Sequence, residues 1–314
     1  KIAAVVRDYT LGVDRLTPVS KNGLEILAAA NRLAQRADVM FAEPDWAFTG
    51  HSDVIPNDTF FGDLWGIHNT GQAGGTVDMD MDGPEAWDIT TGSNAVIVTI
   101  IDVGTDLTHP DLNLAPGADF AGTGANGGPS NSCDNHGTAV AGCVSARFNN
   151  NLGVVGIAPS CRSSPAKCFN SVVPCNGNWN AQGSWTVDAL NFAQANGHRV
   201  TNNSNGYGFT LAAIDTAYQN TWNVGIVHFA SNGNSGASTI GYPANIPVVN
   251  GVCALQRNGN RASFSQYGPG TDFSAPGQAI DSTDRQGAAG YTATDYNVVD
   301  GTSFASPYSA GVAA

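Results

Sequence analysis

The fold class of this chain is indicated by the stretch Ala95-Val96-Ile97-Val98-Thr99-Ile100-Ile101. It is a continuous apolar run rich in β-branched residues, which is typical of a strand buried on both faces of a parallel sheet. Further runs follow it, extended at 199–203, 224–230 and 246–249 and helical at 185–195 and 211–218. Strands that alternate with helices predict an α/β fold, with a parallel central sheet covered by helices on both faces.

Three short segments carry side chains suited to catalysis. They are Ile100-Ile101-Asp102-Val103-Gly104, Asp134-Asn135-His136-Gly137-Thr138 and Gly301-Thr302-Ser303-Phe304-Ala305-Ser306-Pro307. A hydroxyl becomes a good nucleophile when a base takes its proton, and a third group must fix the tautomer of that base. Asp102 directly follows the predicted strand, so we expect it at the carboxyl ends of the strands, where parallel sheets bind ligands.

In this chain order the three segments resemble the active-site segments of the subtilisin-like serine proteases, the subtilases. The resemblance runs from about Asp58 to the C-terminus. It implies a secreted serine endopeptidase that hydrolyses peptide bonds of polypeptide substrates through an acyl-enzyme, with no cofactor for catalysis. Ser303 would be the nucleophile and His136 the general base. Asp102 would orient His136 and stabilise its imidazolium form.

The resemblance also assigns residues that would bind the oxyanion and the substrate. Asn234 matches the asparagine whose side-chain amide donates to the oxyanion, and Asn232 is the nearby alternative. Ser204-Asn205-Gly206 match the strand that binds the substrate backbone by strand addition, and Gly241 matches the floor of the pocket. Family members usually carry an apolar or aromatic residue where Asn205 stands, so we expect a more polar pocket wall. No acidic cluster lies along these segments, so a preference for paired basic residues is not expected.

A structural calcium ion is a further implication of the resemblance, because calcium prefers hard oxygen ligands. Asn150 lies in a segment, 148–159, that matches the calcium loop of the family. Asp111, which follows His-Pro, and Asp80 match two further acidic ligands. We expect these three side chains to converge on one ion although they lie far apart in the sequence.

The formal net charge of −13 is unevenly distributed. Residues 1–50 hold six Lys/Arg and six Asp/Glu, whereas residues 51–314 hold seven Lys/Arg and twenty Asp/Glu. An acidic surface repels phosphate backbones, so nucleic acid is not expected as a partner. No apolar run reaches the roughly 18–20 residues of a membrane helix, so no membrane span is expected.

The six cysteines favour an oxidising compartment and therefore a secreted protein. Six cysteines allow fifteen complete pairings, which the sequence alone does not distinguish. The resemblance to subtilases of heat-tolerant organisms favours a disulfide between Cys133 and Cys175. Cys253 lies in a strand-like run and is expected to be a free buried thiol.

The change in charge balance near residue 50 predicts a domain boundary. A helical pattern at 24–34, followed by a strand-like run at 39–46, resembles the second half of a subtilase inhibitory propeptide. The alternative is an unrelated small α/β appendage. We expect residues 1–50 to be a small α+β propeptide remnant that binds its own enzyme, and residues 51–314 to be the peptidase domain. Only eleven residues follow Ser303, so this domain is expected to be incomplete at its C-terminus.

Two other interpretations compete with an active endopeptidase. A catalytically silent binding or scaffold protein on the same fold would carry a substitution at a catalytic position, and none is present in the matching segments. A sedolisin-type acid peptidase would use Glu and Asp and would lack the histidine segment, so the segment around His136 argues against it.

Overall fold

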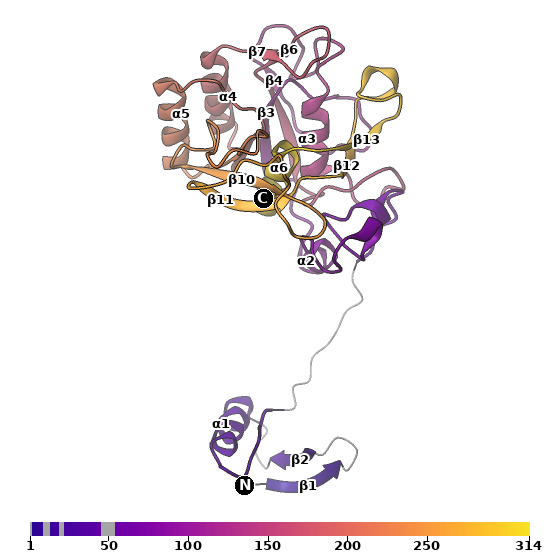
Figure 1. The fold of residues 1–314 in the computed structure, drawn as a ribbon, viewed down its shortest axis with the longest axis vertical. Helices are drawn as coiled ribbons and strands as arrows, with labels where there is room; N and C mark the ends of the chain where they lie inside the picture. The colour runs from indigo at the N-terminus through magenta and orange to yellow at the C-terminus, as the bar shows by residue number, and fades with distance from the viewer. Residues whose placement is uncertain (1, 9–12, 19–21, 45–53) are drawn as a thin grey trace. The chain divides into compact units, whose positions relative to one another are not determined.

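The computed structural model describes residues 2–8, 13–18, 22–44 and 54–314. The chain divides into two compact units, Lys1–Ser52 and Asp53–Ala314, which Figure 1 draws as ribbons. Every candidate catalytic residue belongs to the second unit.

The N-terminal unit contains an antiparallel pair of strands and one helix: β1 (Ile2–Asp8), β2 (Val13–Pro18) and α1 (Gly23–Ala34). The helix predicted at 24–34 is therefore confirmed. It begins after Asn22, whose side chain accepts a hydrogen bond from the Leu24 amide at 3.0 Å. The strand predicted at 39–46 is wrong for residues 39–44, which form neither helix nor strand. Among the described residues, the sheet of this unit contains only β1 and β2, and residues 39–44 pair with neither strand. Residues 45–46 lie outside the described residues.

A seven-stranded parallel sheet forms the centre of the second unit. Its strand order is β11-β10-β9-β8-β3-β5-β4. The strands are β3 (Ile97–Asp102), β4 (Ala118–Asp119), β5 (Arg162–Lys167), β8 (Val200–Asn203), β9 (Val227–Ser231), β10 (Val249–Leu255) and β11 (Thr271–Pro276). This arrangement confirms the predicted α/β fold with a parallel central sheet.

Helices cover both faces of this sheet (Figure 1). The pair α4 (Gly183–Ala195) and α5 (Ala212–Asn223) covers one face, and the pair α3 (His136–Ser145) and α6 (Thr302–Val312) covers the other. In β3, Ile100 packs into the core cluster that contains Val140 of α3. The next residue, Ile101, packs into a second cluster with Leu190 of α4. A strand between two helical layers needs apolar residues at every position, which explains the run at 95–101.

Shorter elements surround the sheet. They are α2 (Gly83–Ile89), three 3₁₀ turns (η1, Phe61–Asp63; η2, Gln72–Gly74; η3, Gly287–Ala289), the hairpin β6 (Asn170–Ser171)–β7 (Trp179–Asn180) and the hairpin β12 (Ile280–Thr283)–β13 (Tyr296–Val299). Within the described residues, no helix combines the length and the apolar character that crossing a bilayer requires.

Candidate active site

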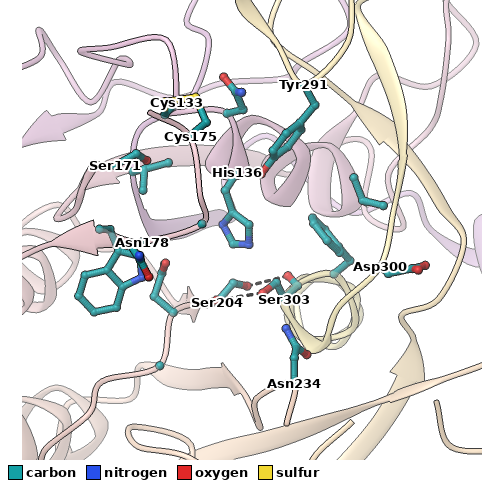
Figure 2. Close-up of a pocket in the computed structure, with 18 of the residues that line it drawn as sticks. Cys133, His136, Ser171, Cys175, Asn178, Ser204, Asn234, Tyr291, Asp300 and Ser303 are labelled. Carbon is teal, nitrogen blue, oxygen red and sulfur yellow. Dashed lines mark hydrogen bonds between the residues drawn. A yellow bond between two sulfur atoms is a disulfide. The ribbon is translucent and has the colours of Figure 1, made fainter. Parts of the chain in front are cut away.

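Five segments meet at the carboxyl edge of the central sheet. Asp102 is the last residue of β3, Ser204–Gly206 follow β8, and Asn234 follows β9. His136 and Ser303 lie in the first turns of α3 and α6. All of them except Asp102 line one cavity of about 570 Å³ (Figure 2). The fold therefore brings together the predicted nucleophile, base and oxyanion donor.

Asp102 and His136 form a hydrogen-bonded pair. The ring Nδ1 lies 2.9 Å from both Asp102 Oδ1 and Asp102 Oδ2. Asp102 is 1% exposed, and the His136 side chain is 23% exposed. A neutral ring with its proton on Nδ1 leaves the lone pair on Nε2 for a substrate or nucleophile. Burial lowers the pKa of His136, but the charge and hydrogen bond of Asp102 outweigh burial, so the pKa lies above its ordinary value.

Ser303 is 8% exposed, and its hydroxyl donates to the Ser204 carbonyl at 3.1 Å. The Ser204 hydroxyl in turn donates to the Ser303 carbonyl at 2.7 Å. In Figure 2 this pair lies between the His136 ring and the Asn234 side chain. The Ser303 hydroxyl must therefore rotate away from Ser204 to reach His136, and catalytic hydrogen bonds often form only when substrate binds.

The side chain of Asn234 is oriented by Thr302. Asn234 Oδ1 accepts from the Thr302 amide at 2.9 Å and from the Thr302 hydroxyl at 2.8 Å. Because its oxygen is occupied, the Nδ2 donor is left for the cavity. The Ser303 amide lies in the first turn of α6, where backbone donors lack an intrahelical acceptor. The alternative, Asn232, instead donates to Thr271 Oγ1 at 2.8 Å and is fully buried.

The cavity is nearly free of charged side chains. Among the described residues that line it there is no Lys, Arg or Glu, and the single acid is Asp300. Its carboxylate accepts from the Ala279 amide at 2.6 Å. Gly241, predicted as the pocket floor, is not among the described lining residues, and its amide donates to the Asn232 carbonyl at 2.8 Å. The structure therefore brings Ser204, Asn205 and Gly206 to the cavity but not Gly241.

The side chain of Asn205 faces Asp102 as well as the cavity. Its Nδ2 lies 3.3 Å from Asp102 Oδ2 and 3.3 Å from the Ile101 carbonyl. The expectation that Asn205 only makes the pocket wall polar is therefore incomplete. Sequence reasoning missed this contact, because the direction of a side chain after a strand is set by neighbours from another strand.

A buried ion pair, which the sequence did not indicate, lies beneath the site. Lys167 and Asp134 are both 0% exposed, and Lys167 Nζ lies 2.9 Å from Asp134 Oδ2. The ammonium also donates to the carbonyls of Val103 and Phe169, at 2.5 and 2.9 Å. Burial raises the pKa of Asp134, but hydrogen bonds from Lys167 and from backbone amides outweigh it and lower the pKa. Lys167 therefore joins the segment after Asp102 to the segment before His136.

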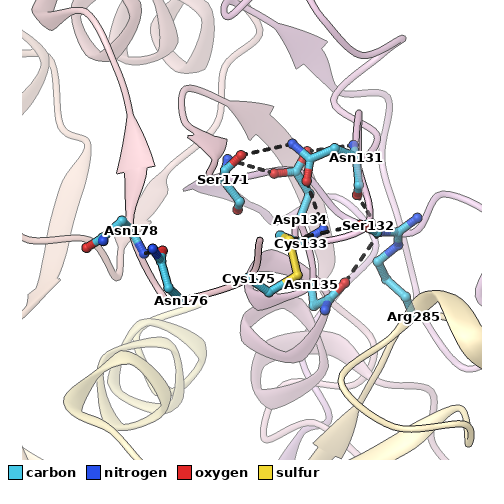
Figure 3. The surroundings of a disulfide bond; sticks show 10 residues. All are labelled: Asn131, Ser132, Cys133, Asp134, Asn135, Ser171, Cys175, Asn176, Asn178 and Arg285. Carbon is cyan, nitrogen blue, oxygen red and sulfur yellow. Dashed lines mark hydrogen bonds between the residues drawn. A yellow bond between two sulfur atoms is a disulfide. The ribbon is translucent and has the colours of Figure 1, made fainter. Parts of the chain in front are cut away.

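The predicted disulfide between Cys133 and Cys175 is confirmed, with Cα atoms 5.1 Å apart. Figure 3 shows it between the loop that precedes α3 and the loop between β6 and β7. Asn131 and Ser171 connect the same loops, because Asn131 Nδ2 donates to the Ser171 carbonyl at 3.1 Å. The other four cysteines are free and buried, as predicted for Cys253.

Of the three predicted calcium ligands, the structure joins two. Asn150 Nδ2 donates to Asp111 Oδ1 at 2.7 Å, and Asp111 is fully buried. Burial raises the pKa of Asp111 despite its hydrogen bonds. The carboxylate of Asp80 instead accepts from the backbone amides of Asn69 at 2.6 Å and Asp82 at 2.7 Å. Each carboxylate oxygen of Asp80 thus has a partner in its own segment, no hydrogen bond among the described residues joins Asp80 to Asp111 or Asn150, and their convergence on one ion stays a prediction.

Asp58 contacts the segment 148–154, which also contains Asn150. Its Oδ2 accepts from the Asn149 amide at 2.8 Å, while its buried Oδ1 has no hydrogen-bond partner among the described residues. A buried carboxylate oxygen without a partner is costly unless a cation or a donor satisfies it. The described residues contain no cluster of three or more His, Cys, Asp or Glu suited to a metal. A calcium site here would therefore also use Asn and backbone oxygens.

Comparisons with known proteins agree with this architecture. Residues 93–314 match Peptidase S8, the Subtilase family. A solved structure of a protease from Pseudoalteromonas arctica PAMC 21717 superposes with a TM-score of 0.69 at 29% identity, over 82% of this chain and 85% of that chain.

Characterised relatives include proteases of several bacteria. The chain is 36% identical over 279 residues to the thermophilic serine proteinase of Bacillus sp. (strain AK1), a match of 88% of this chain and 62% of the relative. It is 40% identical over 229 residues to M-protease of Shouchella clausii (strain KSM-K16), at 71% and 54% coverage. It is also 40% identical over 229 residues to Subtilisin Savinase of Lederbergia lenta, at 71% and 76% coverage. The chain thus spans only part of the length of these relatives.

Proposed function

The chain belongs to the Subtilase family, and we propose that it is a secreted serine endopeptidase that cleaves polypeptides through an acyl-enzyme on Ser303. The observation that carries the proposal is the Asp102–His136 pair, which leaves Nε2 of the ring available beside Ser303. The disulfide between Cys133 and Cys175 supports an oxidising, extracellular location.

The catalytic groups would act in a sequence of proton transfers and bond changes. After the Ser303 hydroxyl leaves the Ser204 carbonyl, His136 Nε2 takes its proton as Oγ bonds to the substrate carbonyl carbon. Asp102 stabilises the imidazolium, and Asn234 Nδ2 and the Ser303 amide donate to the oxyanion. His136 then gives the proton to the leaving amine. Water, deprotonated by the same ring, hydrolyses the acyl-enzyme and regenerates the Ser303 hydroxyl.

The substrate backbone would pair with the segment Ser204–Gly206. The backbone N–H and C=O of Gly206 have no partner among the described residues, so both are available for strand addition. We retain the proposal, from the family resemblance, that Gly241 forms the floor of the substrate pocket. Because the described lining of the cavity holds one acidic side chain, Asp300, and no Lys or Arg, we propose that the residue before the scissile bond, P1, is large and uncharged.

A mixture of internally quenched peptides, with products identified by mass spectrometry, tests this function. We expect cleavage at internal bonds and selection of large uncharged P1 residues, because nothing in the described cavity would pair with a basic side chain except Asp300. Release of single terminal residues would contradict an endopeptidase, and strong selection of Arg or Lys would contradict the uncharged pocket. No cleavage of any peptide would favour the silent scaffold protein.

We also propose a structural calcium ion held by Asp58, Asp111 and Asn150. The support is the unpartnered buried Oδ1 of Asp58 and the contacts of Asp58 and Asp111 with the segment 148–154, which contains Asn150. Carboxylate and amide oxygens fit calcium. The ion would supply positive charge that compensates these buried oxygens, and it takes no part in peptide hydrolysis. This proposal replaces Asp80 with Asp58.

Calcium removal should lower the melting temperature, since a ligand that binds only the folded state stabilises it. At calcium concentrations of about 100 times Kd we expect a loss of roughly 5–10 °C in excess chelator. Asp58→Asn and Asp111→Asn should shrink this calcium-dependent difference, whereas the control Asp80→Asn should keep it. Equal melting temperatures with calcium and with chelator would rule the site out. If the calcium-dependent difference in melting temperature disappears only in Asp80→Asn, the ligand is Asp80, as the sequence predicts, and not Asp58.

For the N-terminal unit we propose a role as an inhibitory propeptide of the peptidase domain, with residues 1–50 as the inhibitor and 51–314 as the enzyme. The support is the similarity of the segment containing α1 to a propeptide and the division of the chain near residue 52.

A further inference from the structure

We infer that Asn205 is a positioning residue that holds the Asp102 carboxylate and sets the basicity of His136. The inference rests on the proposed peptidase function. Asn205 is 6% exposed, and its Nδ2 reaches both Asp102 Oδ2 and the Ile101 carbonyl at 3.3 Å. It thus donates to the same carboxylate oxygen that lies 2.9 Å from the His136 ring.

The chemistry of its neighbours fixes the orientation of this amide. Both groups that Nδ2 contacts, a carboxylate and a carbonyl, are hydrogen-bond acceptors. Exchanging the nitrogen and oxygen of the amide would place Asn205 Oδ1 against two acceptors, which repel it. The donor must therefore point toward Asp102, and the amide oxygen is left on the side of the cavity.

Asp102 has few other groups to compensate its buried charge. The Val103 amide donates to its Oδ1 at 2.8 Å, and the His136 ring supplies the second contact. No Lys or Arg of the described residues forms an ion pair with Asp102, and Lys167 is paired with Asp134. Because a buried carboxylate is costly without donors, the side-chain amide of Asn205 is one of three described groups that compensate and orient the Asp102 carboxylate.

The donor is itself held in place. The backbone N–H of Asn205 donates to Asn203 Oδ1 at 3.1 Å. Asn203 Nδ2 in turn lies 3.1 Å from the Tyr207 hydroxyl and 3.2 Å from the Tyr218 hydroxyl, all in the buried core. A donor that is fixed before reaction costs no reorganisation during proton transfer.

The hydrogen bond from Asn205 to Asp102 should change the pKa of His136, because it alters the negative charge that the ring experiences. The negative charge of Asp102 raises the pKa of His136, and a hydrogen bond to the carboxylate reduces that effect. Asn205 therefore keeps the ring less basic than an apolar residue at this position would, and it extends activity toward lower pH.

Other ionisable groups near the Asp102–His136 pair would not account for a change in the pKa of His136 in an Asn205 variant. Burial raises the pKa values of Cys168 and Tyr291, so both stay neutral at neutral pH. Asp300 lines the cavity from the segment between β13 and α6, and its carboxylate is held by the Ala279 amide. None of the three forms a hydrogen bond with His136.

The test compares Asn205→Leu, which has similar size and no donor, with Asn205→Asp, which adds a carboxylate. We expect kcat of Asn205→Leu to fall roughly 10-fold with KM changed less than about threefold, as for loss of a hydrogen bond to a charged group. The acid limb of kcat/KM should move to higher pH in Asn205→Leu and further in Asn205→Asp. Thermal melts, with Asn205→Ala as a smaller substitution, check that each variant folds.

Two outcomes would overturn the inference: an acid limb that stays in place in both variants, or a change confined to KM, which would make Asn205 a pocket wall only. NMR titration of the His136 ring in a Ser303→Ala background measures the His136 pKa directly and does not depend on catalysis. If the wild-type chain cleaves no peptide, the proposed function fails, and a higher His136 pKa in Asn205→Leu still supports the inference.

Discussion

Ser303→Ala is expected to abolish peptide hydrolysis, with a loss in kcat on the order of 10⁶-fold, the size known for the equivalent change in a subtilisin. The reason is that no other described hydroxyl of the cavity lies where His136 and Asn234 can both act on it. The Ser204 hydroxyl is committed to the Ser303 carbonyl at 2.7 Å. KM for peptides should change little, because the segment that binds the substrate backbone is untouched.

Ser309→Ala is the matched control, since Ser309 lies on the same helix, α6, at its partly exposed face. Its kcat should equal that of the unchanged chain. If Ser303→Ala retains more than about a thousandth of the activity, after contaminating proteases are excluded, a different nucleophile must operate and the assignment of Ser303 is wrong.

Lys167→Met is expected to destabilise the fold by about 3–5 kcal/mol, the usual cost of removing one partner of a buried ion pair. Asp134 would keep its backbone donors but lose the Lys167 ammonium, and the Val103 and Phe169 carbonyls would each lose a donor. Val103 directly follows Asp102, and Asp134 lies two residues before His136. Any folded fraction should therefore also show a lower kcat.

A double-mutant cycle with Asp134→Asn separates the ion pair from simple loss of packing. Denaturant unfolding should show that Lys167→Met and Asp134→Asn together cost less than the sum of the two single changes, by roughly 1–3 kcal/mol. Additivity within about 0.5 kcal/mol, or a cost of Lys167→Met below about 1 kcal/mol, would show that the pair does not contribute as proposed.

The fold class could be predicted from the sequence because a strand that is buried on both faces has a recognisable run of apolar residues. The run at 95–101 is apolar except for Thr99, since Ile100 and Ile101 face different helical layers. The positions of Asp102, His136 and Ser303 follow from local rules, because each residue ends a strand or begins a helix. The strand predicted over 39–46 is wrong for residues 39–44, which pair with neither described strand of the N-terminal unit, because an apolar run alone does not fix which segments pair.

Contacts between segments that lie far apart in the chain could not be predicted from the sequence. Lys167 and Asp134 are 33 residues apart, and a single lysine in a strand gives no sign of its partner. The choice between Asp80 and Asp58 depends on the path of the chain around the segment 148–154, not on residue type. For Asn205 the sequence predicts only a pocket wall, because nothing in it shows that the side chain is directed at Asp102.

Covalent labelling tests whether Ser303 is a nucleophile that His136 activates. The folded chain is treated with a fluorophosphonate probe, and the modified residue is identified by intact mass and peptide mapping. We expect one label per active chain, on Ser303, with labelling lost in Ser303→Ala and strongly slowed in His136→Ala. A label on another residue, or equal labelling in the His136→Ala variant, would contradict it.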